Sequence, residues 1–429
     1  MVVMTTDIHR AIDAVWRMES PKVIASLARI VRDVSLAEDL AQDALVAAME
    51  SWPESGIPDN PGAWLTATAK HRAMDTFRRN KLLERKHAEL GRDMDARQEA
   101  AVADLENALD DDVGDDLLRL VFVACHPVLT PEARVALTLR LLGGLTTDEI
   151  ARAFLVPELT IAQRIVRAKR TLAEKHVPFE VPRAADLPAR MTSVLEVIYL
   201  IFNEGYSATA GDDLLRPSLC EDALRLGRIL AELAPKEAEV HGLVALMEIQ
   251  ASRSKARVGP GGEAILLLEQ DRARWDRLLI SRGLAALERA QKIDNLRGAY
   301  ALQAAIAACH ARATTAAETD WKRVAMLYRT LVELVPSAVV ELNRAVAVGM
   351  AFGPAAGMEI VETLASEPSL KNYHLLPSVR GDLLAKLGRN EEARAEFERA
   401  AALTRNTREQ ELLLKRAGDC ARAAAGSGQ

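Results

Sequence analysis

The sequence predicts an all-α protein, and three observations support this prediction. Aromatic residues make up only 4% of the 429 residues, whereas alanine and leucine, which favour helices, are abundant. No segment shows the long alternation of β-branched residues that is typical of a strand, and no Asn-Gly pair indicates a hairpin. With 49% apolar residues, the chain can bury the cores of two to four domains.

Composition divides the chain into four parts. Residues 7–90 are predicted to be helical, with a loop from Ser51 to Asn60, and residues 91–116 to be an acidic linker. Residues 117–176 are predicted to form a compact helical unit. After a proline-rich connection, Val177 to Arg190, a long helical part covers residues 190–420.

Charge is segregated along the chain, which the net charge of −6 hides. Residues 98–118 hold eight acids and no base: Glu99, Asp104, Glu106, Asp110, Asp111, Asp112, Asp115 and Asp116. Basic residues cluster on either side, at Lys70–Lys86 and Arg164–Lys175. Because binding to DNA depends on the local field, the net charge does not exclude a DNA-binding protein.

The stretch LTTDEIARAFLVPELTIAQRIVRAKRTL, from Leu145 to Leu172, predicts a helix-turn-helix. Thr146 is expected to cap the first helix in a capping box with Glu149, and Pro157 marks the turn. Thr160 and Gln163 repeat the box pattern at the expected start of the second helix.

On a helical wheel the second helix has two opposite faces. Ile161, Ile165, Ala168 and Leu172 form a stripe that is expected to be buried. The predicted DNA contacts lie away from it or on its flanks: Gln163, Arg164, Arg167, Lys169 and Arg170. Arginine and glutamine suit base edges, and flanking bases suit phosphates. The alternative is a solvated basic face on an ordinary helical hairpin.

The second half shows weak internal similarity. RILAELAPKEAEVHGLVAL begins at Arg228 and RTLVELVPSAVVELNRAVAV at Arg329, an offset of about three 34-residue tetratricopeptide (TPR) periods. The segment around Val258–Gly262 does not keep the period. These features predict stacked helix pairs that form a solenoid.

Three motifs together resemble the extracytoplasmic-function (ECF) branch of the sigma-70 factors. They are AEDLAQD in the helix after Ser35, AWLTATAKHRAMDTFRR after Gly62, and the helix-turn-helix. In the second half, YLIFNEGYSATAG, LEQDRARWDRLLISRG and LNRAVAV resemble the ECF group that carries a C-terminal TPR-like extension. The resemblance implies sigma region 2 at residues 7–90, region 4 at residues 117–176 and a regulatory TPR-like domain at residues 190–420.

The resemblance also implies partners and site residues. Core RNA polymerase would be contacted through its β′ clamp helices and β flap, with Glu38, Asp39, Gln42 and Asp43 binding the clamp. Promoter −10 DNA would be gripped by Lys70, Arg72, Arg78 and Arg79, and −35 DNA by the second helix of the helix-turn-helix. The loop Ser51–Asn60 would capture an extruded base. Trp52 stacks on that base or anchors the core.

The C-terminal half is expected to act in cis on the sigma domains, through contacts or through an unknown protein or small-molecule partner. In NEGY, Asn203 to Tyr206, we weigh a polar contact between domains against a helix end at Gly205, and favour the helix end. The scattered cysteines, Cys125, Cys220, Cys309 and Cys420, predict neither a zinc site nor disulfides.

No motif for catalysis or for a cofactor is present, and we expect no metal, no membrane span and a cytoplasmic location. The alternative function is a helix-turn-helix transcriptional regulator with a TPR-like sensor domain that acts without binding core polymerase.

Overall fold

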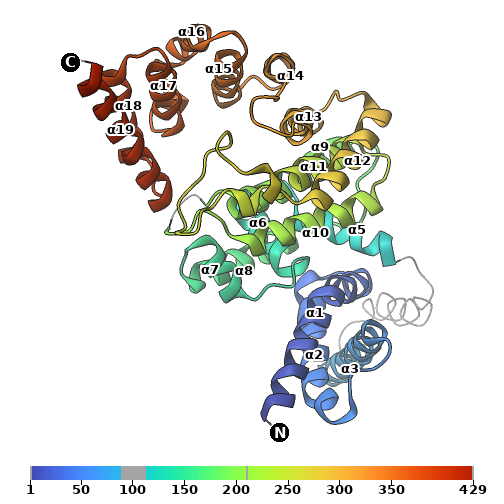
Figure 1. The fold of residues 1–429 in the computed structure, drawn as a ribbon. Coiled ribbons are helices and arrows are strands. Elements are labelled where there is room, and N and C mark those ends of the chain that lie inside the picture. Colours follow the sequence, from blue (N-terminus) through green and yellow to red (C-terminus); the bar gives the residue numbers. More distant parts are fainter. Residues whose placement is uncertain (1, 88–112, 209–210, 428–429) are drawn as a thin grey trace. The chain divides into compact units, whose positions relative to one another are not determined.

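The structure is a computed structural model that describes residues 2–87, 113–208 and 211–427 (Figure 1). It confirms the all-α prediction, because every regular element of the described residues is a helix and only two isolated β-bridges occur. None of these helices is both long and apolar enough to cross a bilayer. The chain divides into two units, Met1–Ile198 and Tyr199–Gln429.

The first unit begins with three helices, α1 (Val2–Val31), α2 (Val34–Ser55) and α3 (Pro61–His87). They pack together around side chains such as Ile24, Leu27 and Leu65, which are almost fully buried. Asn60 caps α3 as expected, since its Oδ1 accepts from the amide of Ala63 at 3.1 Å.

The unit continues with α5 (Val113–Ala124), α6 (Pro131–Leu141), α7 (Thr147–Phe154) and α8 (Glu158–Glu174). The linker prediction is therefore wrong at its end, because Asp115 and Asp116 lie in the first turn of α5. Asp116 is buried there against Arg29 of α1, with 2.9 Å between Nε and Oδ2. The rest of the acidic run, Glu99 to Asp112, lies outside the described residues.

The boundary between the units falls inside helix α9 (Leu187–Tyr206). Its first residues pack in the first unit: Arg190 donates to the carbonyl of Phe122 at 2.6 Å, and Ser193 donates to that of Cys125 at 2.6 Å. Arg134 of α6 in turn donates to the hydroxyl of Ser193. The proline-rich connection is thus followed by a helix whose first half packs against α5 and α6.

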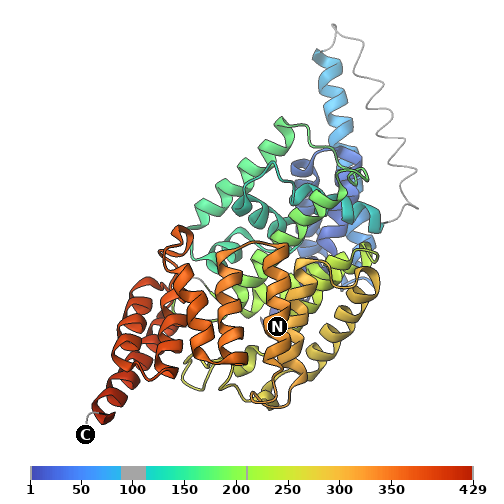
Figure 2. The same cartoon turned by 90° about the horizontal axis from the view of Figure 1, so that it is seen from above.

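The second unit is built of antiparallel helices that follow one another along the chain. They are α10 (Pro217–Leu233), α11 (Ala238–Ala251), α12 (Arg277–Asp294), α13 (Ala299–Arg312), α14 (Trp321–Leu334), α15 (Ala338–Phe352), α16 (Pro354–Leu364), α17 (Leu375–Lys386), α18 (Asn390–Leu403) and α19 (Thr407–Ser427). Figure 2 shows the later helices of this unit standing side by side in sequence order.

The repeat period fails where the sequence suggested it would. Between α11 and α12 the chain makes a long connection with two short 3₁₀ turns, η1 (Ser254–Ala256) and η2 (Arg272–Arg274). A third turn, η3 (Pro368–Leu370), precedes α17.

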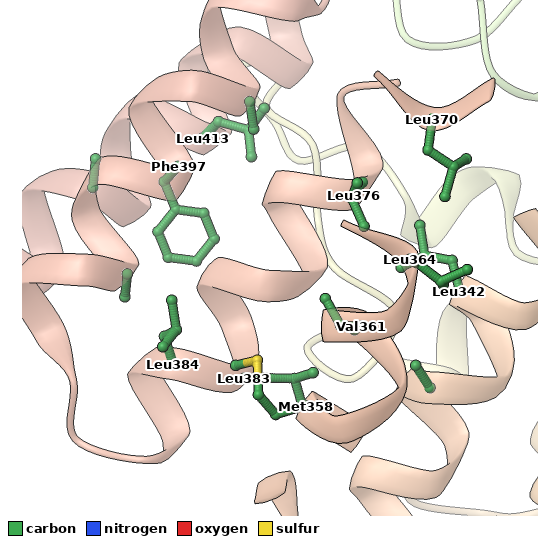
Figure 3. Close-up of a cluster of buried hydrophobic side chains, with 14 of the residues drawn as sticks. Leu342, Met358, Val361, Leu364, Leu370, Leu376, Leu383, Leu384, Phe397 and Leu413 are labelled. Carbon is green, nitrogen blue, oxygen red and sulfur yellow. The ribbon is translucent and has the colours of Figure 1, made fainter. Parts of the chain in front are cut away.

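At the C-terminal end of the second unit, Phe397 of α18 is buried against Leu384 and Leu413 in a contiguous apolar cluster (Figure 3).

Residues far apart in sequence are joined within the second unit. The side chain of Asn406, before α19, donates to the carbonyls of Ala208 and Asp213 at 3.1 and 3.0 Å. Asn406 is 1% exposed, so these bonds are shielded from water. The start of the unit is thereby held against its last helix.

Candidate polymerase and nucleic-acid interface

The helix-turn-helix forms largely as predicted. Thr146 caps α7 in a capping box with Glu149, and Leu155 adopts a left-handed conformation, φ 51°, at the turn. The stripe of Ile161, Ile165, Ala168 and Leu172 is buried. The second capping box is wrong: α8 begins at Glu158 with Pro157 as its N-cap, so Thr160 and Gln163 lie inside the helix.

The outer face of α8 presents a mixed polar and apolar surface. Gln163, Arg167 and Arg170 are exposed, and Arg164 is half-buried beside the carboxylate of Glu132. Arg170 forms a 2.6 Å ion pair with Glu174, but both side chains are more than half exposed. Val166, 64% exposed, lies among these residues. Such a face can reach bases through glutamine and arginine and the thymine methyl through valine.

Lys169 departs from its expected position. Its side chain is only 15% exposed, and its Nζ lies 2.5 Å from Oε2 of Glu38 on α2. The expectation that Lys169 contacts phosphate therefore does not fit this arrangement, because the ammonium group faces the interior of the unit. On a helical wheel Lys169 lies on the flank of α8, and from there its side chain can point outwards to DNA or inwards to the core.

Glu38 is the buried centre of a charged cluster. Its side chain is 4% exposed, and Oε1 accepts from Nε of Arg140 on α6 at 2.6 Å and from Nε2 of Gln42 at 2.7 Å. Together with Lys169, these contacts connect the α1–α3 group to α6 and α8. In this arrangement the polar groups of Glu38 and Gln42 bind one another, and Glu38 also binds α6 and α8; their contact with polymerase stays a prediction.

The other two residues that were predicted to bind polymerase, Asp39 and Asp43, lie on the outward face of α2. Asp39 and Asp43 are exposed, and Val46 and Met49 are 49% and 42% exposed on the following turns. Such a face can offer apolar contact area to a protein and can meet basic groups with its acids. We call Asp39, Asp43, Val46 and Met49 the α2 outer face.

The four basic residues expected at −10 DNA lie on α3 but differ in exposure. Lys70 is 9% exposed, and burial lowers its pKa, with Arg29 adding to that effect. In this arrangement the ammonium group of Lys70 is not accessible to DNA, and its contact with −10 DNA stays a prediction. Arg72 lies 3.7 Å from Asp43, and Arg78 is exposed, 3.9 Å from Asp75. The side chain of Arg79 lies outside the described residues.

The loop expected to capture a base is shorter than predicted. Helix α2 continues to Ser55, and Gly56, φ 83°, turns the chain towards Asn60. Trp52 is 1% exposed, and its ring meets that of Trp64 edge-on at 5.2 Å. Of the two roles considered for Trp52, the structure supports the core anchor.

NEGY lies at the end of α9 and is used inside the second unit. Glu204 forms an ion pair with Arg216, and the carbonyl of Gly205 accepts from the amide of Arg216 at 2.7 Å. Helix α9 continues to Tyr206, so Gly205 does not stop it. A Cβ at Gly205 would lie 2.6 Å from the amide nitrogen of Cys220, which shows that glycine is required for the close approach of α10.

Sequence reasoning missed Arg140 and Arg17. Arg140 donates a hydrogen bond to Glu38, which precedes it by 102 residues in the sequence, and Arg17 of α1 forms an ion pair with Glu149 of α7. Neither arginine lies in a motif, and only the tertiary structure identifies its partner. A cavity of about 310 Å³ lies beside them, lined by residues that include Trp16, Leu45 and Val46.

Comparisons with known proteins agree with this architecture. Residues 15–82 match sigma-70 region 2, residues 119–172 match sigma-70 region 4, and residues 190–291 match a family of unknown function. An uncharacterized protein of Rhizobium meliloti (strain 1021) is 42% identical over 393 residues, which are 91% of this chain and 91% of that protein. A probable ECF RNA polymerase sigma factor, SigI, of two Mycobacterium tuberculosis strains is 26% identical over 176 residues, 41% of this chain and 59% of that protein.

Two sigma regions thus match in the expected order, on the helices that carry the predicted motifs, and a relative of unassigned role matches nearly end to end. The chain therefore belongs to the ECF branch of the sigma-70 family, whose members act in transcription initiation, and it carries a C-terminal helical-repeat extension.

Proposed function

We propose that this protein binds core RNA polymerase, directs it to promoters through α8 at −35 and α3 at −10, and is modulated in cis by its C-terminal unit. The observation that carries the proposal is α8, where Gln163, Arg167 and Arg170 stand opposite a fully buried apolar stripe. Arg164 would contact phosphate from the flank, while Arg72 and Arg78 would serve −10 DNA.

The polymerase contact is assigned to the α2 outer face. Asp39 and Asp43 supply negative charge for basic groups on the β′ clamp, and Val46 and Met49 supply apolar contact area. Glu38 and Gln42 join this contact only after the cluster with Arg140 and Lys169 separates. The proposed sigma activity therefore includes an opening step in which α2 and α8 part.

Modulation in cis is supported by helix α9. Its first half packs on α5 and α6 through Arg190 and Ser193, and its last residues, including Tyr206, pack among the helices of the second unit. A change in the second unit that alters the end of α9 would reach region 4 along the chain. Whether the effect is activation or inhibition is decided by experiment.

The test is in vitro transcription from the promoter upstream of the gene, with purified core polymerase and the full chain. Asp39→Asn with Asp43→Asn should weaken core binding by roughly 1–2 kcal/mol. Asp75→Asn, a matched exposed acid on α3, should leave it unchanged. If the full chain shifts promoter DNA equally well with and without core polymerase, the alternative regulator is correct and the sigma assignment fails.

A second comparison tests whether the C-terminal unit modulates the activity of the rest of the chain. A chain ending at Val181 would lose Arg190 and Ser193 from the region 4 core, so its failure would say nothing about regulation. A chain ending at Ile198 keeps these contacts and is compared with the full chain for core affinity and transcript yield, after its helicity is checked by circular dichroism. Equal values for both would exclude modulation by the second unit.

A further inference from the structure

The connection between α11 and α12 builds a stack of arginines and aromatic rings in the second unit. The Cζ of Arg257 lies 3.8 Å from the centre of the Tyr206 ring, and that of Arg253 lies 5.7 Å from the same ring. Arg253 also lies 5.9 Å from the Trp275 ring, and Arg272 lies 5.0 Å from it. Three guanidinium groups therefore alternate with two rings. We call this set, with the neighbouring His310, the arginine cluster.

No carboxylate of the described chain forms an ion pair with any of the three arginines. Arg272 donates instead to the carbonyls of His310 and Ala313, both at 2.8 Å, and to the hydroxyl of Thr319 at 3.0 Å. Arg257 donates to the carbonyl of Tyr206. The positive charges are thus held by neutral oxygens and rings, which offset less of the cost of burial than an anion would.

The cluster also concentrates buried polar atoms that have no hydrogen-bond partner within the described chain. These atoms are Nε of Arg253, Nε of Arg272, Nε1 of Trp275, Nδ1 of His310 and Oε1 of Gln270. Arg272, Trp275 and His310 are 6%, 3% and 7% exposed. The arginine and tryptophan nitrogens can only donate hydrogen bonds, so they require an acceptor. A buried donor that is left unsatisfied keeps the full cost of its desolvation.

Neighbouring groups add to this donor-rich character. Burial, together with the fields of Arg253 and Arg272, lowers the pKa of His310 to about 4, so the imidazole is neutral at physiological pH. Burial raises the pKa of Tyr328 to about 12, and this phenol, which lies within the field of Arg253, remains a hydrogen donor. Glu409, whose charge acts on Arg257, is already bound by His374 at 3.2 Å and Thr404 at 2.8 Å.

We propose that the arginine cluster is a binding site for an oxyanion, a phosphoryl or carboxylate group of a small molecule. One oxyanion would neutralise the excess positive charge and accept from the unpartnered donors. Arg253 is the principal ligand, because its guanidinium lies between the other two and makes no side-chain hydrogen bond within the described chain. Trp321, whose ring lies 5.1 Å from His310, also borders a mostly apolar cavity of about 410 Å³, which provides room for the body of a larger ligand.

The test uses the full chain without polymerase or DNA, so its outcome is independent of the proposed sigma activity. Sodium phosphate and sodium acetate are titrated at matched ionic strength against sodium chloride at pH 7.5, with the thermal midpoint and the heat of binding as readouts. Arg253→Gln removes the principal ligand, and Trp275→Phe removes the indole N–H donor but keeps an aromatic ring at this position. Arg282→Gln, an exposed arginine of α12, is the matched control.

We expect saturable binding of phosphate, acetate or both in the wild type and in Arg282→Gln, with at least about tenfold weaker binding in Arg253→Gln. The probe that binds identifies the phosphoryl or the carboxylate group as the ligand. Phosphate also stabilises proteins without binding, but that effect rises without saturation and would be equal in all variants. If neither probe binds saturably, or if both Arg253→Gln and Trp275→Phe bind like the wild type, the proposal is refuted and the cluster only fastens the connection to the repeats.

Discussion

The ion pair between Lys169 and Glu38 allows a sharp test of the proposed opening step. Lys169→Met removes the charge but keeps an unbranched side chain. Breaking a fully buried pair costs about 3–5 kcal/mol. Here the lysine side chain is 15% exposed, and Glu38 retains Arg140 at 2.6 Å. A smaller loss of about 1–2 kcal/mol is therefore expected.

That loss should appear as tighter binding of core polymerase. If the closed form predominates in solution, weakening it by about 1–2 kcal/mol raises the open fraction, and with it the apparent core affinity, by about 5- to 30-fold. The assay is fluorescence anisotropy of labelled protein titrated with core polymerase in the absence of DNA. Omitting DNA separates this effect from any loss of a promoter contact.

Arg170→Met is the matched control, one residue along the same helix. Its pair with Glu174 has the same kind of geometry, 2.6 Å, but the two side chains are 77% and 57% exposed. Such pairs contribute less than about 1 kcal/mol, so neither stability nor core affinity should change much. Unaltered core affinity in Lys169→Met, together with unaltered stability to urea, would refute the argument that this pair holds the first unit closed.

Four other predictions follow from single contacts. Arg167→Ala should weaken promoter complexes by about 1–3 kcal/mol and relax discrimination at −35, while Lys175→Ala, just beyond α8, should change little; competition with −35 variants measures both. Burial and the neighbouring arginines lower the pKa of His310 to about 4, so the folded state binds fewer protons than the unfolded state below pH 6.5. The contribution of His310 to the free energy of unfolding is therefore fully present above pH 6.5 and is lost as the pH falls towards 4. Between pH 7.5 and pH 5, protonation linked to His310 should lower the free energy of unfolding by about 2 kcal/mol. The difference in urea stability between these two pH values, measured in chloride, should therefore be smaller in His310→Gln than in the wild type. Burial raises the pKa of Cys125 to about 11 and that of Cys220 to about 12, so iodoacetamide at pH 8 should modify both far more slowly in the folded than in the unfolded chain, as mass spectrometry would show. Gly205→Ala should destabilise the second unit by about 1–3 kcal/mol because its Cβ meets the Cys220 backbone, whereas Gly418→Ala, with its nearest atom 3.7 Å away, should be neutral or slightly stabilising in thermal unfolding.

The sequence predicted the features that depend on local periodicity. Residues Ile161, Ile165, Ala168 and Leu172 recur at helical spacing, and burial of such a stripe is decided by the residues themselves. The capping box at Thr146 and the cap at Asn60 are local in the same way. The break in the repeats near Val258 could be predicted because the 34-residue period is interrupted in the sequence itself.

Charged side chains were harder to place because their partners are distant. Lys70 and Lys169 both lie on helix flanks, where a lysine can turn outwards to DNA or inwards to an acid. Asp116, at the border of an acidic run, pairs with Arg29, which precedes it by 87 residues. No pattern within a helix distinguishes these arrangements, so each requires the tertiary structure.

Competition for Glu38 links the closed arrangement to the proposed function. One carboxylate has two oxygens, and here Arg140 and Gln42 meet one of them and Lys169 the other. A basic group of polymerase would have to displace these groups to reach Glu38, and the displacement would free the Lys169 ammonium of α8 to turn towards solvent. Polymerase binding through Glu38 would therefore make Lys169 available to promoter phosphates in the same step. The closed form would have neither contact, so we expect the chain to bind promoter DNA more weakly alone than with core polymerase.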